Sequence, residues 1–431
     1  MANEPTAARP RLLWIKTELL HPVDKGGKIR TYEMLRRLKD THHITYLTLD
    51  DNTASADDRA RASEYCDELV CVPFAAPERG SARFYLEVVR NVASKLPYAI
   101  ARYRSAAMRQ AISAQAVRCD VVVCDFLVSA INMPVLQSPT VLFQHNVEAE
   151  IWRRHAANRS HALSRLFFHE QFRRMQRFER RACQAFDSVI AVSAEDCELM
   201  RRNYGLTRVD WVPTGVDTEF FTPDDAPSKD RRTLVFTGSM DWMPNEDAIA
   251  WFVAEVMPII KRTVSDARLV VVGRNPGVAL KELAVRRDDI VVTGRVEDVR
   301  PFVRAARCFV APIRIGGGTR LKICEALAVA KPVVSTTIGA EGLPLAAGQD
   351  LLLADDPQSF AAAVVSVLTD DTVAAQLAQR GLATVREKFG WGRVAQRFSE
   401  LCAAATHDHD RSASDALSLV ERRGDSLFGA E

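Results

Sequence analysis

A short segment around residue 320 combines glycines, cations and a carboxylate in an order that suits anion binding. Thr319 is a candidate N-cap for a helix starting at about Arg320, whose free N–H groups and positive dipole end would point back along the chain. Arg320 and Lys322 add two positive charges there. The preceding glycines lack a Cβ, so their backbone can approach a ligand closely: Gly316, Gly317 and Gly318. The segment therefore predicts a site for phosphate oxygens.

Glu325 supplies a second kind of chemistry on the same predicted helix. It lies five residues beyond Arg320, which places it ~8 Å deeper along the helix axis. That spacing suits a carboxylate that binds ribose or sugar hydroxyls while a diphosphate occupies the helix start. The alternative is a glycine turn and a solvated helix, with Lys322 and Glu325 paired at i,i+3 for a few tenths of a kcal/mol.

Composition limits the remaining possibilities. The 431 residues suggest two domains of roughly 200 residues, and 47% hydrophobic residues are typical of a folded protein. With 57 basic and 55 acidic residues the net charge is +2, so no overall field indicates nucleic acid. Nine scattered cysteines lack a C-x-x-C pair, which predicts reduced thiols in a cytosolic protein.

The sequence also bears on membrane contact. The first residues lack the basic and apolar regions of a signal peptide, and no run of about 18 apolar residues occurs. We therefore expect a cytoplasmic chain whose membrane contact, if it has any, is peripheral and at the inner face of the cell membrane.

Short apolar runs alternate with longer amphipathic stretches, a pattern typical of parallel sheets with helical crossovers. In the first half, a loop over 21–27 and a helix over 29–39 follow the first of six expected strands, at 11–16, 44–49, 68–72, 120–124, 140–143 and 188–192. The alternation restarts after a Pro- and Asp-rich segment at 222–232, where we expect a domain boundary. Five further strands are expected at 233–236, 268–272, 290–293, 308–311 and 332–335.

These elements predict an α/β protein with two doubly wound, Rossmann-like domains facing across a cleft, where the carboxyl ends of the strands bind ligands. The expected organisation is an N-terminal extension (1–10), two domains (11–210 and 211–390), a C-terminal helix that crosses back (391–405) and a flexible tail (406–431). Histidines 407 and 409 in the tail leave metal binding open, but solvated side chains are the commoner outcome.

Six motifs in order along the chain resemble those of the retaining glycosyltransferases of family 4, which have the two-domain GT-B fold. The resemblance covers residues 11–403. The motifs lie at residues 24–30 (DKGGKIR), 144–146 (QHN), 191–193 (AVS), 212–217 (VPTGVD), 235–238 (VFTG) and 325–334 (EALAVAKPVV).

The resemblance implies roles for individual residues. Gly26 and Gly27 match the glycine loop near the donor phosphates and the acceptor, although a tight strand-to-helix turn would need them equally. His145 matches a histidine near the transferred sugar, with a structural role as the alternative, and Glu325 matches the acid that binds ribose. The remaining donor-side matches are Gly238 and the loop containing Arg295 and Val296, whose main chain would hold the base.

Three positions depart from the family pattern. The first acid of the family's E-x7-E signature falls at Gly317, so either a backbone amide replaces it or another acid such as Glu341 does. The cations that relatives carry after the first strand of the second domain are missing from residues 238–245, and we infer that Arg320 and Lys322 replace them. The usual Gly before Lys-Pro is Ala330, so we expect the helix end to avoid a left-handed cap.

The resemblance implies transfer of a sugar from a nucleotide diphosphate sugar, with retention and without an obligatory metal or other cofactor, in exopolysaccharide or other envelope glycan assembly. Arg320 and Lys322 would neutralise the leaving diphosphate. The acceptor, a glycan or a polyprenyl-linked sugar, is expected on the first domain. There the arginine- and aromatic-rich stretches 83–104 and 152–181 are either an anionic-membrane contact or ordinary solvated helix faces. An epimerase or hydrolase, or a non-catalytic donor-binding subunit, are the alternatives.

Overall fold

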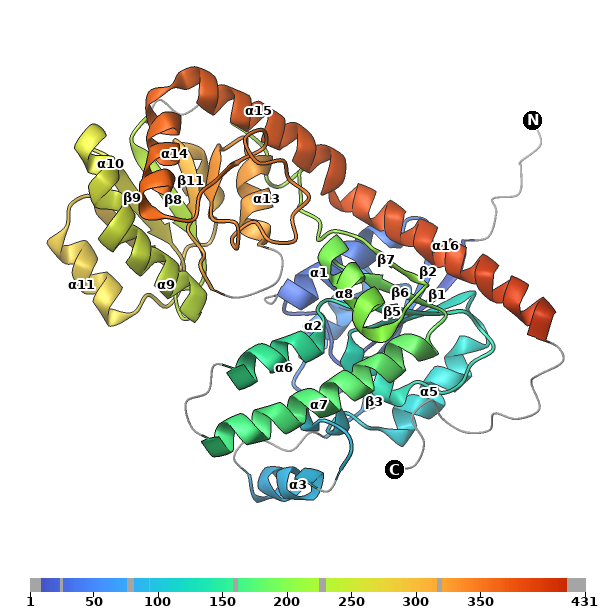
Figure 1. Cartoon of the computed structure of the whole chain (residues 1–431). Coiled ribbons are helices and arrows are strands. Elements are labelled where there is room, and N and C mark those ends of the chain that lie inside the picture. Colours follow the sequence, from blue (N-terminus) through green and yellow to red (C-terminus); the bar gives the residue numbers. More distant parts are fainter. Residues whose placement is uncertain are drawn as a thin grey trace, which may run out of the picture. The chain divides into compact units, whose positions relative to one another are not determined.

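The chain forms two compact units, each built on one parallel sheet (Figure 1). The computed structural model describes residues 9–23, 26–75, 81–92, 94–157, 162–224, 230–315 and 320–416. Unit 1 comprises Met1–Val212 and Ala395–Glu431, and unit 2 comprises Pro213–Val394. The predicted class, two Rossmann-like parallel sheets flanked by helices, is confirmed.

Unit 1 has a seven-stranded sheet of order β3-β2-β1-β4-β5-β6-β7. Its strands are β1 Arg11–Lys16, β2 His43–Asp50, β3 Glu68–Pro73, β4 Val121–Asp125, β5 Thr140–Phe143, β6 Ser188–Ala191 and β7 Val209–Trp211. Its helices are α1 Gly26–Leu38, α2 Ala56–Ala60, α3 Ala82–Val92, α4 Tyr98–Ala101, α5 Ala106–Ala116, α6 Glu148–Ala157, α7 Ala162–Ala185, α8 Ala194–Tyr204 and most of α16 Trp391–Ala416, with the 3-10 helices Arg61–Glu64 and Leu127–Asn132.

Unit 2 has a six-stranded sheet of order β10-β9-β8-β11-β12-β13. The strands are β8 Thr233–Thr237, β9 Arg268–Val272, β10 Ile290–Gly294, β11 Cys308–Ala311, β12 Val333–Ser335 and β13 Leu352–Leu353. The helices are α9 Met243–Trp251, α10 Met257–Thr263, α11 Val278–Arg286, α12 Arg300–Ala305, α13 Leu321–Ala328, α14 Pro357–Thr369 and α15 Asp371–Lys388, with a π-helical turn at Phe252–Val256.

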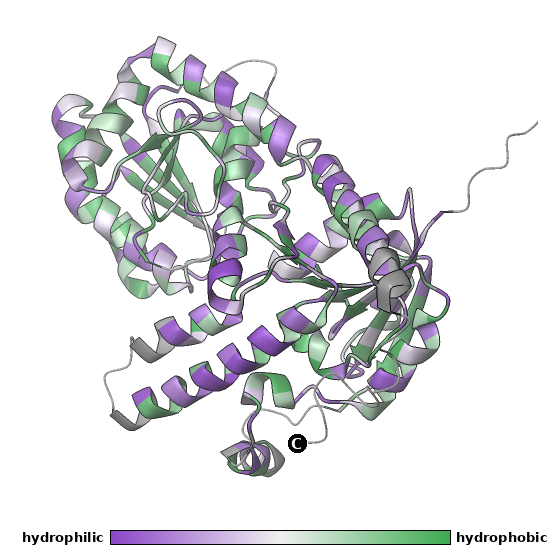
Figure 2. Ribbon diagram, turned by 45° about the vertical axis from the view of Figure 1, so that its right-hand side comes forward, coloured by the Kyte–Doolittle hydropathy of each residue, from purple (hydrophilic) through white to green (hydrophobic). Residues whose placement is uncertain are grey.

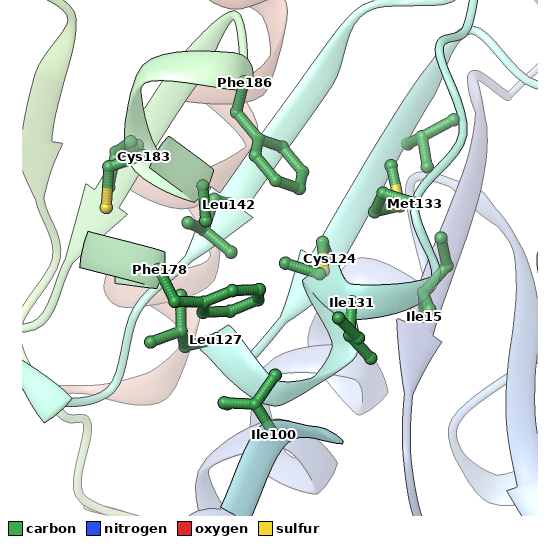
Figure 3. Close-up of a cluster of buried hydrophobic side chains, with 14 of the residues drawn as sticks. Ile15, Ile100, Cys124, Leu127, Ile131, Met133, Leu142, Phe178, Cys183 and Phe186 are labelled. Carbon is green, nitrogen blue, oxygen red and sulfur yellow. The ribbon is translucent and has the colours of Figure 1, made fainter. Parts of the chain in front are cut away.

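The sheets are buried on both faces, which explains why their strands are continuous apolar runs. In β8, Leu234 and Phe236 join one apolar cluster while Val235 joins another, as the two-residue period of a strand requires. In unit 1, Ile15 lies opposite Cys124 in the register of β1 and β4. Figure 3 shows these two side chains among the core residues of unit 1. In Figure 2 the strands of both sheets are coloured as hydrophobic, whereas the surrounding helices mix hydrophobic and hydrophilic residues.

All eleven predicted strands are present, and within the described residues the prediction missed only the short edge strands β7 and β13. Helix α1 begins at Gly26 rather than at residue 29, so both predicted loop glycines lie in its first turn. The predicted helix end near residue 405 is wrong, because α16 continues to Ala416. Its Phe398 packs against Trp14 and Phe143 of unit 1, with ring centroids 5.4 and 5.0 Å apart.

The predicted tail is therefore partly helical, and one of its histidines is engaged. His409 contacts Asp187 Oδ1 at 3.0 Å and the Gln137 carbonyl at 2.9 Å. No group of three or more His, Cys, Asp or Glu side chains suited to a metal occurs within the described ranges. Residues 417–431 lie outside them.

The end of α13 corrects another prediction. Ala330 has a φ of +55°, the left-handed conformation that we expected this helix end to avoid. Its N–H donates to Leu327 and the Lys331 N–H donates to Ala326, at 2.9 and 3.0 Å. These two bonds form the Schellman motif, which holds an alanine at the position that usually carries glycine.

Candidate functional site

Each sheet has a reversal of strand order that marks where its ligands bind. In unit 1 the order reverses between β1 and β4, and in unit 2 between β8 and β11. Open parallel sheets bind ligands beyond the carboxyl ends of the strands at such a point.

In unit 2, two cations from α13 lie at this edge. Arg320 occupies the N-cap position of α13, and its guanidinium lies 5.4 Å from the centre of the Trp242 ring. Lys322 Nζ donates to Asn245 Oδ1 at 2.9 Å and lies 4.2 Å from the centre of the Phe236 ring. Both cations are thus held by residues on β8 and on the segment that follows it.

The surroundings of Lys322 lower its pKa, an effect that the sequence did not predict. Burial, with Arg320 close by, lowers the pKa of Lys322 to about 7, although Glu325 opposes this shift. Burial also raises the pKa of Glu325 to about 7, and Lys322 offsets only part of that effect. Without a bound anion, Lys322 therefore holds its proton less strongly than a solvent-exposed lysine. A bound diphosphate would raise its pKa again.

The glycine loop itself, Gly316, Gly317, Gly318 and Thr319, lies outside the described residues. The helix that follows begins at Leu321, one residue later than predicted. Glu325 lies near the middle of this eight-residue helix, half-buried and five residues from Arg320. The cations and the carboxylate therefore share one helix, in the order that the sequence predicted.

Two glycines bring the backbone of β8 and β9 into close contact beside Lys322. A Cβ on Gly238 would lie 2.6 Å from Lys322 Nζ, and a Cβ on Gly273 would lie 1.7 Å from the Gly238 carbonyl oxygen. Neither position tolerates a side chain unless its surroundings move. The sequence prediction included Gly238 but missed Gly273, Trp242 and Asn245. The signal for Gly273 was its place directly after the apolar strand β9.

The other predicted donor residues lie at neighbouring strand ends. Arg295 is exposed and Val296 is half-buried after β10, where Gly294 has a φ of +73°. Glu341 is exposed in the turn that follows β12, the strand next to β11.

In unit 1, the corresponding edge carries a buried charge network that the sequence prediction missed. Asp125, at the end of β4, accepts hydrogen bonds at Oδ2 from Lys16 Nζ (2.8 Å), Thr31 Oγ1 (2.6 Å) and Trp14 Nε1 (3.1 Å). Asp125 and Lys16 are 0% and 1% exposed. Burial alone would raise the pKa of Asp125, but Lys16 and His145 hold it below the ordinary value. The sequence did contain a signal for this network, because Lys16 and Asp125 are charged residues at the ends of strands that are otherwise apolar.

His145 belongs to this network. Its Nε2 lies 2.7 Å from Asp125 Oδ1, and its ring stacks on Phe126 with centroids 3.7 Å apart. Burial lowers the pKa of His145 to about 3 against the opposing effect of Asp125. Because the ring is neutral, Lys16 supplies the positive charge that balances the Asp125 carboxylate.

Phe126 lies between His145 and Gly27, one of the two predicted glycines. It has a φ of +68°, an uncommon conformation for a bulky residue, which often marks a functional site. A Cβ on Gly27 would lie 2.7 Å from Phe126 Cζ, whereas a Cβ on Gly26 would meet no atom within 4 Å. Gly27 is therefore needed for packing at this edge, while Gly26 has room for a side chain.

Glu179 of α7 fixes the loop that carries His145. Its carboxylate accepts hydrogen bonds from Gln144 Nε2 at 2.9 Å, the Glu148 N–H at 2.8 Å and the Ala149 N–H at 2.9 Å. Burial raises the pKa of Glu179 to about 7. This residue therefore holds the segment between β5 and α6, and the sequence prediction did not identify it.

The nine cysteines are free thiols, and Cys124, Cys183 and Cys324 are buried. Among the described helices, none is long and apolar enough by itself to cross a membrane. Helices α14 and α15 reach that length and hydropathy only as a pair bent by 99°.

Two family models match successive parts of the chain. Residues 25–220 match the model of Glycosyltransferase Family 4, and residues 231–370 match that of Glycosyl transferases group 1. An uncharacterized 44.6 kDa protein in the cps region of Klebsiella pneumoniae is 19% identical over 89% of this chain and 97% of that protein. The D-inositol 3-phosphate glycosyltransferase of Xylanimonas cellulosilytica is 29% identical over 53% of this chain, a match covering 59% of that enzyme.

Solved structures support the same architecture. Anabaena Alr3699/HepE in complex with UDP has a TM-score of 0.61 at 12% identity, covering 91% of this chain and 100% of that one. Sucrose-phosphate synthase from Thermosynechococcus elongatus has a TM-score of 0.63 at 16% identity, covering 95% of this chain and 100% of that one. These likenesses confirm the predicted GT-B fold class.

Proposed function

Because the chain carries a Glycosyltransferase Family 4 domain and a Glycosyl transferases group 1 domain on a GT-B fold, we propose that it transfers a hexosyl group from a nucleotide diphosphate sugar. One observation carries this proposal. Arg320 and Lys322 lie at the start of α13, next to the β8–β11 reversal where a parallel sheet binds its ligand. The complex of Anabaena HepE with UDP supports a nucleotide donor for this fold.

Each donor-side residue has a distinct role in the proposal. Arg320, Lys322 and the N–H groups at the start of α13 neutralise the diphosphate as it leaves the sugar. Glu325 binds a ribose or sugar hydroxyl, and its raised pKa lets it either donate or accept that hydrogen bond. Close packing of Gly238 and Gly273 keeps the backbone beside Lys322 in place.

The proposed reaction retains the anomeric configuration. The bond from the sugar C1 to the diphosphate oxygen breaks as the acceptor hydroxyl attacks the same face of the sugar. The acceptor's proton passes to the departing phosphate, so the mechanism requires no dedicated base on the protein and no metal. Cations that stabilise the developing charge then dominate catalysis.

The acceptor side belongs to unit 1, and the acceptor is a glycan or a lipid-linked sugar. The cps-region relative supports a place in polysaccharide assembly. His145 lies at the carboxyl end of the unit 1 sheet, where its neutral ring and its backbone are oriented by Asp125 and Glu179. We propose that it positions the transferred sugar. Peripheral contact with an anionic membrane is part of the proposal for the arginine-rich helices.

The test measures turnover with UDP-, GDP- and ADP-linked sugars. Arg320→Ala and Lys322→Ala should each lower turnover by roughly 100-fold or more, because each removes a cation that would stabilise the negative charge of the leaving diphosphate. Arg286→Ala, which changes an exposed arginine on α11, is the matched control and should retain activity. Full activity in both purified site variants would contradict the assignment.

Incubation with donor alone separates the rival functions. An epimer or a free sugar formed without acceptor would indicate an epimerase or hydrolase on the same fold. Nucleotide binding without turnover on any acceptor would instead indicate a donor-binding subunit.

A further inference from the structure

A pocket of about 520 Å³ lies in unit 1 between α3, α4, α6 and α7. Most of its wall is aromatic or aliphatic: Phe84, Tyr85, Tyr98, Trp152, Leu166, Phe167 and Phe168. The rings contact one another, with centroids 5.7 Å apart for Phe84 and Tyr98 and 5.8 Å for Trp152 and Phe168. Its volume is within the usual range for a small-molecule site.

The polar side chains of this pocket are already hydrogen-bonded to other groups of the same chain. Arg174 donates to the Asn91 carbonyl at 2.7 Å and to Glu170 Oε1 at 2.9 Å. Gln171 Oε1 accepts the Tyr98 N–H at 3.0 Å. What the pocket offers a ligand is therefore mainly carbon.

Exposed apolar side chains surround the opening. Tyr85, Leu86 and Val89 of α3 are 61%, 48% and 66% exposed, and Leu166 and Phe167 of α7 are 66% and 46% exposed. Figure 1 shows α6 and α7 running side by side, with α3 next to them. An apolar patch made by two elements around one pocket usually marks a binding site.

The same elements carry exposed cations. Arg90 follows Val89 on α3, Lys95 lies between α3 and α4, and Arg165 and Arg173 lie on α7. Apolar side chains beside exposed arginines and lysines match a lipid with an anionic head group, because both parts of the lipid find a complementary surface.

A polar pocket of about 470 Å³ begins one helical turn away. Tyr98 lines the apolar pocket at the start of α4, while Arg102 and Tyr103, just after α4, line the polar one together with Lys28 and Asp50. Four residues of helix span only ~6 Å.

Arg102 is placed at this junction. Its guanidinium lies 5.3 Å from the Tyr103 ring centre and 6.0 Å from that of Tyr98. Its Nε is buried without a hydrogen-bond partner among the described residues. Three carboxylates line the polar pocket, those of Glu18, Asp50 and Asp51. Asp50, at the end of β2, is already bound by Arg59 at 2.9 and 3.1 Å.

We propose that unit 1 binds an amphiphilic, lipid-linked acceptor, with its hydrocarbon chain in the aromatic pocket and its anionic head in the polar pocket beside Arg102. This inference rests on the proposed function and narrows the acceptor from any glycan to a lipid-linked anion. The juxtaposition of the two pockets across α4 carries it.

Vesicle binding by the full-length chain tests the hydrocarbon site. Vesicles of phosphatidylcholine and phosphatidylglycerol with brominated acyl chains should quench part of the tryptophan fluorescence, and Trp152→Phe should remove that part. Leu166→Ser combined with Phe167→Ser should weaken partitioning by about 30-fold or more. Val278→Ser with Val285→Ser, two exposed positions on α11, is the matched control and should bind normally.

Dodecyl phosphate below its micelle concentration tests the head-group site by calorimetry. Wild-type protein should bind it more tightly than inorganic phosphate or dodecyl maltoside, and Arg102→Gln should weaken it about 5-fold. Arg104→Gln, an exposed arginine two residues away, should not.

Several outcomes would overturn the inference. These are no vesicle binding by wild type, equal quenching in Trp152→Phe, or equal dodecyl phosphate binding in Arg102→Gln. If the wild-type protein is a dimer that does not bind vesicles, and the Leu166/Phe167 variant is a monomer, the surface would instead bind a second copy of the chain. Nucleotide binding is measured on the same preparations to separate the lipid site from the proposed function. If the wild-type protein binds no nucleotide, the proposed function is contradicted, but the evidence for lipid binding is unaffected.

Discussion

Asp125→Asn should strongly destabilise unit 1, because it leaves the Lys16 ammonium buried without a counter-charge. The substitution preserves shape but removes the charge that accepts the 2.8 Å bond from Lys16 Nζ. Breaking a buried ion pair in this way typically costs ~3–5 kcal/mol. Lys16 could instead fold neutral, and deprotonating a group with an ordinary pKa of 10.5 at pH 7 costs about 5 kcal/mol, which sets the upper limit.

The free energy of unfolding of the variant should also depend on pH. Burial already lowers the pKa of Lys16 in the wild-type fold, and Asp125 opposes that effect. Loss of the Asp125 charge lowers this pKa further, so the unfolded variant binds more protons than the folded variant below pH 10.5. The free energy of unfolding should therefore rise with pH between 7 and 9, by up to about 1.4 kcal/mol per pH unit, relative to wild type.

Thermal and urea unfolding at pH 7 and pH 9 provide the measurement. At pH 7 the unit 1 transition should fall by about 10 °C, since each kcal/mol shifts a domain of this size by ~2–4 °C. Lys16→Met combined with Asp125→Asn removes both charges and should recover much of the loss. A single variant within 2 °C of wild type (about 1 kcal/mol or less), or a double variant less stable than the single one, would show that the ion pair does not stabilise unit 1 in this way.

Three further predictions concern unit 2. Nucleoside diphosphate binding should weaken between pH 7 and 9 as Lys322 loses its proton, by up to about 10-fold per pH unit, and Lys322→Arg should abolish that dependence in calorimetry. Ala330→Gly should raise the free energy of unfolding by about 1 kcal/mol, because glycine adopts the left-handed conformation without strain. Gly205→Ala, the reverse change at φ +67°, should lower the free energy of unfolding of unit 1 by a similar amount. Denaturant unfolding in which the two substitutions shift stability in the same direction would count against this. Gly273→Ala should cost ~1–3 kcal/mol and weaken nucleotide binding by shifting Gly238, while Gly392→Ala, which meets no atom within 4 Å, should leave nucleotide binding unchanged.

Sequence patterns predicted the strands well because a strand buried on both faces must be a continuous apolar run. Val121 to Cys124 and Cys308 to Ala311 are such runs, and both were found. The edge strands β7 and β13 have three and two residues, too few for a pattern. The end of α16 was missed because polar residues on an exposed helix resemble a tail.

The candidate site was predictable only where one segment contains the chemistry. Arg320, Lys322 and Glu325 lie within six residues, so their spacing was readable. Lys16 and Asp125 each end an apolar strand, but they lie 109 positions apart, and no local pattern reveals that they pair. The lowered pKa of Lys322 depends on burial by neighbours that only the fold supplies.

The proposed function requires a nucleotide diphosphate site at the start of α13, and thermal-shift experiments can detect that site directly. UDP-, GDP- and ADP-linked sugars are compared on wild type and Lys322→Ala. We expect at least one donor to stabilise wild type, by ~2.7 kcal/mol at 100 times its Kd, and to stabilise Lys322→Ala far less at the same concentration. No shift with any donor, or an equal shift in both proteins, would contradict the proposed site.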